Sequence, residues 1–352
     1  MTADELRAVF DATEPLTVGL EEEVMLLDAE TLDLAPVARR VVGGSLKLEL
    51  PASQLEIVTT PSRSVGESVA QLAAGRRELA ALAGERVRPA VAGVHPFAAP
   101  LGELNTGERY DTILAGYGDV ARAQLVCALQ VHVALGSADR TLAVYNALRG
   151  HLPELAALAA NAPFHAGRDT GLASVRPLIG GLLPRQGVPP VIPSWEAFAE
   201  MLRWVDEPRL WWWELRPHPT FGTLEIRVCD AQTTVAEAKA VAAFAYAMVA
   251  WLAARYDAGE RLGAPESWRI AENRWVAARH GVDGVFRDLE TGARRAVRDV
   301  LRDRLEAFGP LPGVEALVEM NGALRQRAVG LDAVTGWLAD RFVPPANVNT
   351  SI

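Results

Sequence analysis

Apolar and polar residues alternate in several short stretches of the first two thirds of the chain, which is the pattern of strands with one buried face. The pattern predicts strands at residues 19–28, 55–58, 90–94, 124–135, 210–216 and 222–230. Apolar residues spaced three and four apart predict helices at residues 66–86, 139–149, 152–160, 194–205, 235–256, 265–280, 291–307, 313–324 and 331–342. Loops are expected at 95–118, 161–174 and 177–193, which are rich in glycine, proline and polar residues. The expected fold class is therefore α+β, with a mainly antiparallel sheet whose apolar face is covered by helices.

The first strand, GLEEEVMLLD at residues 19–28, carries three consecutive glutamates in an otherwise apolar run. Because successive side chains of a strand point to opposite faces, Glu21 and Glu23 share one face, with their carboxylates about 7 Å apart. Glu22 falls on the opposite, apolar face and is the exception to the pattern. The apolar residues that define this face are Val18, Leu20, Val24 and Leu26. Two neighbouring carboxylates repel each other unless a positive charge lies between them, so we expect a divalent cation beside Glu21 and Glu23.

Ionisable residues recur on the polar faces of four separate strands. They are Glu21 and Glu23, then Glu56, then His132, and finally Glu225 with Arg227. Carboxylates combined with one imidazole suit Mg²⁺ or Mn²⁺ better than zinc. Taken singly, each residue also has an ordinary interpretation as a solvated glutamate, a core histidine or one half of a salt bridge between Arg227 and Glu225. Cys229 is expected on the same face, where a structural role is the simpler interpretation.

Composition and charge indicate which kinds of binding partner the protein is not suited to. The 352 residues include 35 basic and 44 acidic side chains, a net charge of −9, which argues against nucleic acid or an anionic membrane as a partner. Cys127 and Cys229 are expected to be buried free thiols. The N-terminal sequence MTADELRAVF lacks the features of a signal peptide, so a cytoplasmic location is expected. No break in composition marks a linker, so residues 1–343 are expected to form one catalytic domain, followed by a frayed tail at 344–352.

Common nucleotide-binding and hydrolase motifs are missing from the sequence. It contains no GxxxxGK[ST], no GxGxxG after a strand, no HExxH and no GxSxG. A nucleotide would therefore be held through metal ions and arginines on the sheet. Arg168 lies between glycines in GRDTG at residues 167–171, where backbone and guanidinium can approach an anion. Surface turns are often built in the same way.

Seven segments of the chain occur in the same order as in a known family: GLEEE, QLEIVT, QVHV, NAPF, GRDTGLAS, WWELRPHPTFGTLEIRVCD and ENRWVAARHG. Between residues 17 and 292 the chain thus resembles the carboxylate–amine ligases related to glutamate–cysteine ligase type 2. The resemblance implies a glutamine synthetase-like or guanidino kinase-like fold, in which the concave polar face of a curved sheet holds metal-bound ATP and substrates. It implies two or more Mg²⁺ (or Mn²⁺) ions on Glu21, Glu23, Glu56, His132 and Glu225. It implies that Arg227 and Arg168 are catalytic residues that bind phosphate or the substrate carboxylate. Arg216 would be a further substrate-binding residue in the same role.

The reaction implied by the resemblance uses ATP to phosphorylate a carboxylate, for the family the γ-carboxylate of glutamate. An amine, such as that of cysteine, then displaces phosphate and forms an amide. His165 and Gln232 depart from the family pattern and are expected near the pocket, where they would affect the choice of amine. Three alternatives are a non-catalytic amino-acid or nucleotide-binding protein, a guanidino-type phosphotransferase, and a hydrolase with paired carboxylates. The helical C-terminal third offers a face for a homodimer.

Overall fold

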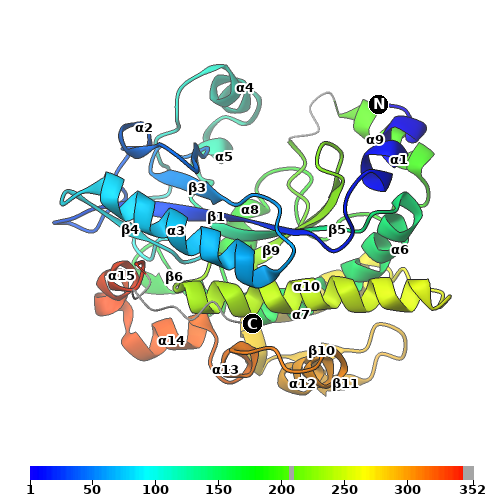
Figure 1. Ribbon diagram of the computed structural model, residues 1–352. Coiled ribbons are helices and arrows are strands. Elements are labelled where there is room, and N and C mark those ends of the chain that lie inside the picture. Colours follow the sequence, from blue (N-terminus) through cyan, green and yellow to red (C-terminus); the bar gives the residue numbers. More distant parts are fainter. Residues whose placement is uncertain (206–209, 344–352) are drawn as a thin grey trace.

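Seven strands form the central sheet of the protein, whose computed structural model describes residues 1–205 and 210–343 (Figure 1). The strand order is β2-β3-β1-β5-β9-β8, β4 pairs with the end of β1, and every pair is antiparallel. The bounds are β1 Val18–Asp28, β2 Leu46–Leu48, β3 Gln54–Val58, β4 Val87–Ala90, β5 Ala128–Ala134, β8 Leu215–His218 and β9 Thr223–Asp230. Two hairpins lie outside this sheet, β6 Phe164–His165 with β7 Arg168–Asp169 and β10 Val285–Arg287 with β11 Arg294–Ala296. The α+β class with an antiparallel sheet is confirmed.

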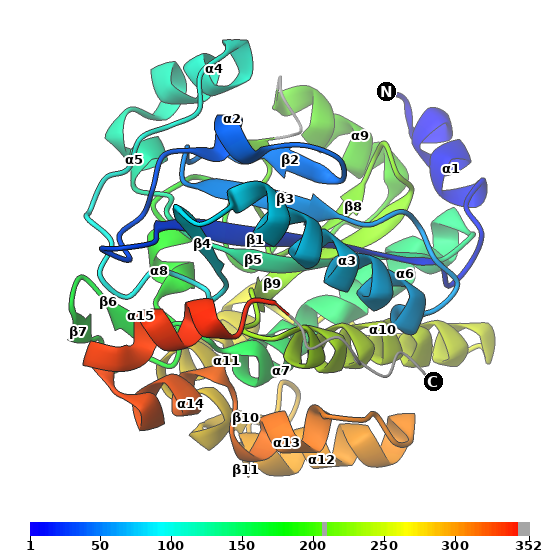
Figure 2. The same ribbon diagram turned by 60° about the vertical axis from the view of Figure 1, so that its left-hand side comes forward.

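Helices pack against one face of this sheet. α3 lies across β1, β3 and β4, α10 contacts β5, and α6 and α7 contact β9; α10 runs beneath the sheet in Figure 1, and α3 lies in front of it in Figure 2. The helices are α1 Ala3–Asp11, α2 Ala38–Val41, α3 Val65–Ala83, α4 Glu108–Tyr117, α5 Asp119–Arg122, α6 Ala138–Leu148, α7 Leu152–Ala159, α8 Arg176–Gly180, α9 Trp195–Trp204, α10 Val235–Asp257, α11 Ser267–His280, α12 Val297–Phe308, α13 Val314–Glu319, α14 Gly322–Val329 and α15 Leu331–Asp340, with 3₁₀ turns η1 Arg149–His151 and η3 Gly281–Asp283.

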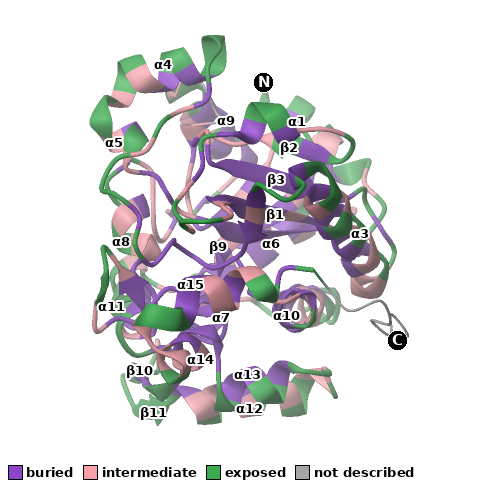
Figure 3. Ribbon diagram, turned by 90° about the vertical axis from the view of Figure 1, so that its left-hand side faces the viewer, coloured by how far each residue is buried: buried purple, intermediate pink, exposed green. Residues whose placement is uncertain are grey.

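The apolar positions of the strands form the core against these helices. On β1, Leu20, Val24 and Leu26 are at most 1% exposed, and on β5 all seven residues are buried. Figure 3 shows the strands of the central sheet as mostly buried, whereas α4 and α12 carry exposed faces. Burial of each large aliphatic side chain contributes about 1.5–3 kcal/mol. The period of two in the sequence therefore decides which residues remain on the polar face.

Glu22, the exception in the sequence pattern, faces the helices and pairs with Arg76 of α3. Arg76 donates from Nε and Nη2 to the two carboxylate oxygens at 2.7 and 2.6 Å, and both side chains are fully buried. The same guanidinium donates to the backbone carbonyls of Gln232, Thr233 and Phe342. A buried carboxylate needs such partners, because an unpaired charge in the core is strongly unfavourable.

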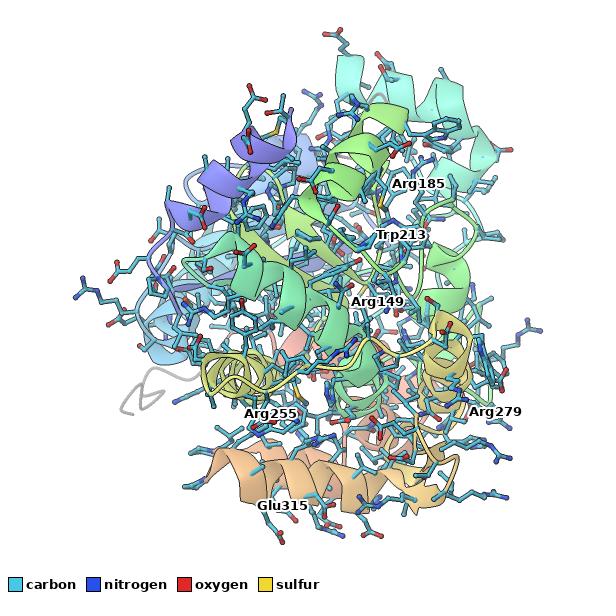
Figure 4. All side chains as sticks on the ribbon, turned by 90° about the vertical axis from the view of Figure 1, so that its right-hand side faces the viewer. Arg149, Arg185, Trp213, Arg255, Arg279 and Glu315 are labelled. Atoms are coloured by element: carbon cyan, nitrogen blue, oxygen red, sulfur yellow. The ribbon has the colours of Figure 1, made fainter. Side chains whose placement is uncertain are left out.

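Helix α10 is the long apolar helix of the core. Thr234 and Glu237 begin it with a capping box, each side chain accepting a hydrogen bond from the backbone of the other. By length and composition α10 could cross a membrane, but 61% of its most apolar window is buried inside the protein. It packs on α3, α6, α7 and α13, and Figure 4 shows it end-on, with Arg255 near its C-terminal end.

Two of the expected strands are displaced. β4 covers residues 87–90 instead of 90–94. Beyond it, the backbone of Gly93 bonds away from β1, because its N–H donates to the carbonyl of Asn161 and its carbonyl accepts from the N–H of Cys127. The strand expected at 210–216 is wrong for residues 210–214, and β8 begins only at residue 215. Trp211 leaves the sheet and packs on Phe198 of α9, with ring centroids 5.9 Å apart.

The helices differ from the prediction in three places. The loop expected at 95–118 contains α4, and the helix expected at 291–307 begins as strand β11 before α12. The helix expected at 313–324 is two helices, because Asn321 caps a new one through the backbone N–H of Leu324. The expected tail at 344–352 lies outside the described residues, and the single-domain organisation stays a prediction.

Candidate active site

A cavity of about 870 Å³ opens on the polar face of the sheet. Its floor comes from β1, β3, β5, β8 and β9, and its walls come from the β2–β3 connection, α4 and residues 176–187 and 210–214. The charged lining residues are Glu21, Glu23, Lys47, Glu49, Glu56, Glu108, Arg109, Arg176, Glu214, Arg216 and Arg227. The volume lies within the range of small-molecule sites, about 300–1,000 Å³.

One group at this floor consists of Glu21, which lines the cavity, with His132 and Glu225, which are buried beside it; their ligand atoms lie within 4.8 Å of one another. The pairing of β1 with β5 and of β5 with β9 brings them together, and His132 lies directly opposite Glu225. Thr223 Oγ1 is 3.0 Å from Nδ1 of the histidine. Its Nε2 is buried, has no hydrogen-bond partner among the described residues and lies 3.7 Å from Glu21 Oε1. A buried nitrogen left open beside carboxylates is suited to a metal ion.

The second group consists of Glu23, Glu49 and Glu56, again with ligand atoms within 4.8 Å. Glu23 pairs with Glu56 across β1 and β3, and Glu49 directly follows β2. Burial and repulsion from Glu49 raise the pKa of Glu23 to about 7, and the same causes raise the pKa of Glu56 well above its usual range. Carboxylates in this arrangement are stabilised by a bound cation.

Two arginines hold Glu225 in its ionised form. Arg216 donates to both carboxylate oxygens through Nε and Nη2, and Arg227 donates to Oε1 through Nη1. Burial alone would raise the pKa of Glu225, but Arg227 and Arg216 hold that pKa well below its usual range. Arg227 also donates to Gln130 Oε1 at 2.6 Å. The salt bridge considered as an ordinary interpretation of Arg227 is present.

A β-bulge changes the faces of β9 near its end. Gln130 alone stands opposite Arg227 and Val228, and such an extra residue shifts the alternation by one position. Cys229 consequently lies in the core, fully buried, and the expectation that it shares a face with Glu225 is wrong. Asp230 turns instead toward Arg176, a cavity residue, and accepts a hydrogen bond from its Nε at 2.8 Å.

All five residues expected to bind metal lie in these two groups, but Arg168 does not reach the cavity. It is exposed on β7, where it pairs with His165 of β6. The short hairpin carries it away from the sheet, and Arg176, eight residues later, lines the cavity in its place.

His165 and Gln232 also lie outside the cavity lining, contrary to expectation. Gln232 is fully buried and donates to the carbonyls of Ala159 and Asp230. Cys127 and Cys229 are buried free thiols, as expected.

Sequence reasoning missed Glu49 and Arg109. Glu49 follows a strand of three residues, which is too short to show an alternation. The signal that would have found it is the pairing of residues 46–48 with 55–57, which brings the end of β2 toward Gln54 and Glu56. Arg109 lies in a region expected to be a loop.

Both groups fit divalent cations, since they combine oxygen ligands and a single imidazole in a cavity with room for a substrate. Five of the six residues lie on β1, β3, β5 and β9, whereas Glu49 follows β2, and the two groups are linked by Glu21 and Glu23 on one strand. Such an arrangement can neutralise a polyanionic substrate.

The wall formed by residues 176–187 continues into a loop that is held from behind by Arg149 and Tyr145. Arg149 is fully buried and donates to the carbonyls of Pro189 and Pro265, and Figure 4 shows it beside the chain that leads into α11. The Tyr145 hydroxyl donates to the carbonyl of Pro190 at 2.8 Å. This side of the cavity is therefore anchored to α6 and to the turn η1 that follows it.

Comparison with known proteins gives consistent results. The model of glutamate–cysteine ligase family 2 (GCS2) matches residues 17–332. A protein of Rubrobacter xylanophilus, provisionally named glutamate–cysteine ligase 2-3, is 36% identical over 366 residues, covering 94% of this chain and 98% of the relative. A protein of Frankia alni, provisionally named glutamate–cysteine ligase 2-1, is 36% identical over 86% of this chain and 84% of its own.

Solved structures share the fold at much lower identity. Glutamate–cysteine ligase from Francisella tularensis, in complex with AMP, has a TM-score of 0.68 at 12% identity and covers 96% of this chain and 91% of its own. A bifunctional glutathione synthetase from Pasteurella multocida has a TM-score of 0.57 at 17% identity, over 99% of this chain and 52% of its own. Because the family model spans most of the sequence and relatives more than 30% identical cover nearly all of it, the chain belongs to glutamate–cysteine ligase family 2.

Proposed function

We propose that the protein is an ATP-dependent carbon–nitrogen ligase that joins the γ-carboxylate of glutamate to an amine, with γ-glutamylcysteine as the first product to test. Membership of the family supports the proposal, as does the AMP bound by the solved relative from Francisella tularensis. The observation that carries it is the presence of two neighbouring carboxylate-rich groups at one cavity. A cytoplasmic location and a homodimer remain predictions.

Two or more Mg²⁺ (or Mn²⁺) ions are part of this proposal. Glu21, His132 and Glu225 would hold one ion, and Glu23, Glu49 and Glu56 another. Bound there, the ions would supply charge neutralisation for phosphoryl transfer, which depends on alignment and electrostatics more than on covalent chemistry by the protein.

ATP would transfer its γ-phosphoryl group to the glutamate carboxylate, giving an acyl phosphate and ADP. The amine would then attack the acyl carbon and expel phosphate. Arg227 uses Nη1 for Glu225 and Gln130, so its other N–H groups can bind a substrate oxyanion, and Arg216 orients Glu225 from the other side. Arg168 has no role in this scheme because it is exposed on the β6–β7 hairpin.

Product analysis tests the reaction class. We would incubate the protein with ATP, Mg²⁺ and glutamate, with and without cysteine and a panel of other amines, and measure ADP, phosphate and new amide mass. Amine-dependent release of ADP and phosphate together with an amide is the expected result. A phosphorylated product that accumulates without phosphate release would favour a phosphotransferase, and binding without turnover would favour a non-catalytic protein.

Glu49→Gln tests the site. Removing one of three mutually repelling carboxylates should leave the melting temperature unchanged or higher, while kcat falls by at least about 100-fold and one bound Mn²⁺ is lost in a titration. Glu85→Gln, an exposed glutamate outside the cavity, is the control and should behave as wild type. Unchanged Mn²⁺ stoichiometry in the Glu49 variant would remove this residue from the metal site.

A further inference from the structure

Most of the arginines in the cavity are already engaged by the protein. Arg216 and Arg227 donate to Glu225. Arg176 donates to Asp230 and to the carbonyls of residues 227 and 228 on β9. These three side chains are 13–18% exposed. Each can therefore offer a ligand only the N–H groups that its protein partners leave over.

Arg109 is different. It is the second residue of α4, lines the same cavity and is exposed. Its guanidinium lies 5.8 Å from the centroid of the Tyr110 ring, and within residues 1–205 and 210–343 no carboxylate pairs with it and no acceptor takes a hydrogen bond from it. Burial raises the pKa of Glu49, and the positive charge of Arg109 opposes that rise. Among the described residues, Arg109 is thus a cation beside the second carboxylate group whose donors are not taken by protein acceptors.

The position of Arg109 is fixed by its neighbours in the chain. Asn105 Nδ2 donates to the carbonyls of Glu49 and Pro51 at 2.7 and 3.2 Å. The hydroxyl of Tyr110 donates to the carbonyl of Leu48 at 3.2 Å. Hydrogen bonds on both sides therefore tie the start of α4 to the segment that carries Glu49, although the rest of α4 stands away from the sheet (Figures 1 and 3).

We propose that Arg109 binds the phosphate chain of the nucleotide at the edge of the group formed by Glu23, Glu49 and Glu56. The proposal rests on the proposed function, which supplies the nucleotide. A guanidinium binds phosphate oxygens through two parallel hydrogen bonds, and no ion pair between Arg109 and another described residue has to be broken. The carboxylates of the amino-acid substrate are the competing anions, and the experiment separates the two.

The experiment compares wild type with Arg109→Gln, Arg109→Lys and Arg122→Gln. Arg122 is the control, because it lies on the neighbouring α5, is 47% exposed, has Asp119 at 3.8 Å and is outside the cavity lining. Calorimetry would give the Kd of ATP with Mg²⁺ in the absence of glutamate, and steady-state kinetics would give kcat and the KM of each substrate. Thermal melting would verify folding.

Arg109→Gln should weaken ATP binding by about 10- to 100-fold, the effect of losing hydrogen bonds to a charged group. The KM of ATP should rise in parallel, while the KM of glutamate stays within about 2-fold. Arg109→Lys should be intermediate, since it keeps the charge without the fork, and Arg122→Gln should match wild type.

Three results would overturn the assignment. An unchanged Kd of ATP in both Arg109 variants would show that this side chain does not bind the phosphates. A higher KM of glutamate with an unchanged Kd of ATP would assign Arg109 to a substrate carboxylate. Failure of the wild-type protein to bind ATP would reject the proposed function itself, which distinguishes that failure from a failure of Arg109.

Discussion

Replacing Arg76 by methionine should remove more than about 4 kcal/mol from the free energy of unfolding. The change leaves Glu22 fully buried without its cation, and breaking a buried pair in this way costs about 3–5 kcal/mol. The carbonyl oxygens of Gln232, Thr233 and Phe342 also lose their donor, at about 1 kcal/mol or more each. With an unfolding entropy of about 2.1 cal/mol/K per residue over 352 residues, a loss of about 4 kcal/mol lowers Tm by about 5 °C.

Differential scanning calorimetry measures this effect. Arg77→Met is the matched control, because Arg77 is the next residue of α3 and is exposed; its stability should stay within about 0.5 kcal/mol of wild type. The double variant Glu22→Leu with Arg76→Met should recover much of the loss, because no buried charge remains. A melting temperature for Arg76→Met within about 1 °C of the control would refute the reasoning.

Three further substitutions test the electrostatics and the packing. Burial alone would raise the pKa of Glu154, but His151 and Arg304 lower it to about 2, so the stability that Glu154 contributes is fully present above about pH 4.5 and is lost as the pH falls toward 2. The stability difference between wild type and Glu154→Gln should therefore shrink over that range in urea titrations, and a difference independent of pH would contradict it. Gly75→Ala places a Cβ 2.4 Å from a side-chain carbon of β3 and should destabilise the protein by about 1–3 kcal/mol. Gly116→Ala in α4 meets no atom within 4 Å and should stabilise it by up to about 1 kcal/mol; equal effects of the two alanines would show that the close approach at Gly75 is relieved at no cost.

The sheet and its acidic face were predictable because they follow from a period of two. Glu21, Glu56, His132 and Glu225 lie on separate strands, and each strand shows by its own alternation which side chains face the polar side. Antiparallel pairing then brings these residues together without further information. For the same reason the place of Glu22 on the core face could be predicted, although its partner Arg76 could not.

The remaining residues depend on contacts that no local pattern records. Glu49 belongs to the site through the pairing of a strand of three residues, and Arg109 through side-chain hydrogen bonds from its neighbours to a distant segment. Trp211 fits a strand pattern by composition but packs against α9, where tertiary contacts override the propensity. Arg168 was expected at the site but lies outside the cavity lining. An arginine between glycines indicates a turn, but it does not show which way the turn faces.

The partners of Arg76 also set the order of events during synthesis. Its guanidinium can bind Glu22 as soon as both have been translated, but its last acceptor, the carbonyl of Phe342, is made 266 residues later. At about 5–20 residues per second, roughly 15–50 s of ribosome time separate the two. Until then the central strand of a nascent chain lacks these contacts, and this part of the core can close only after residue 342 has been made.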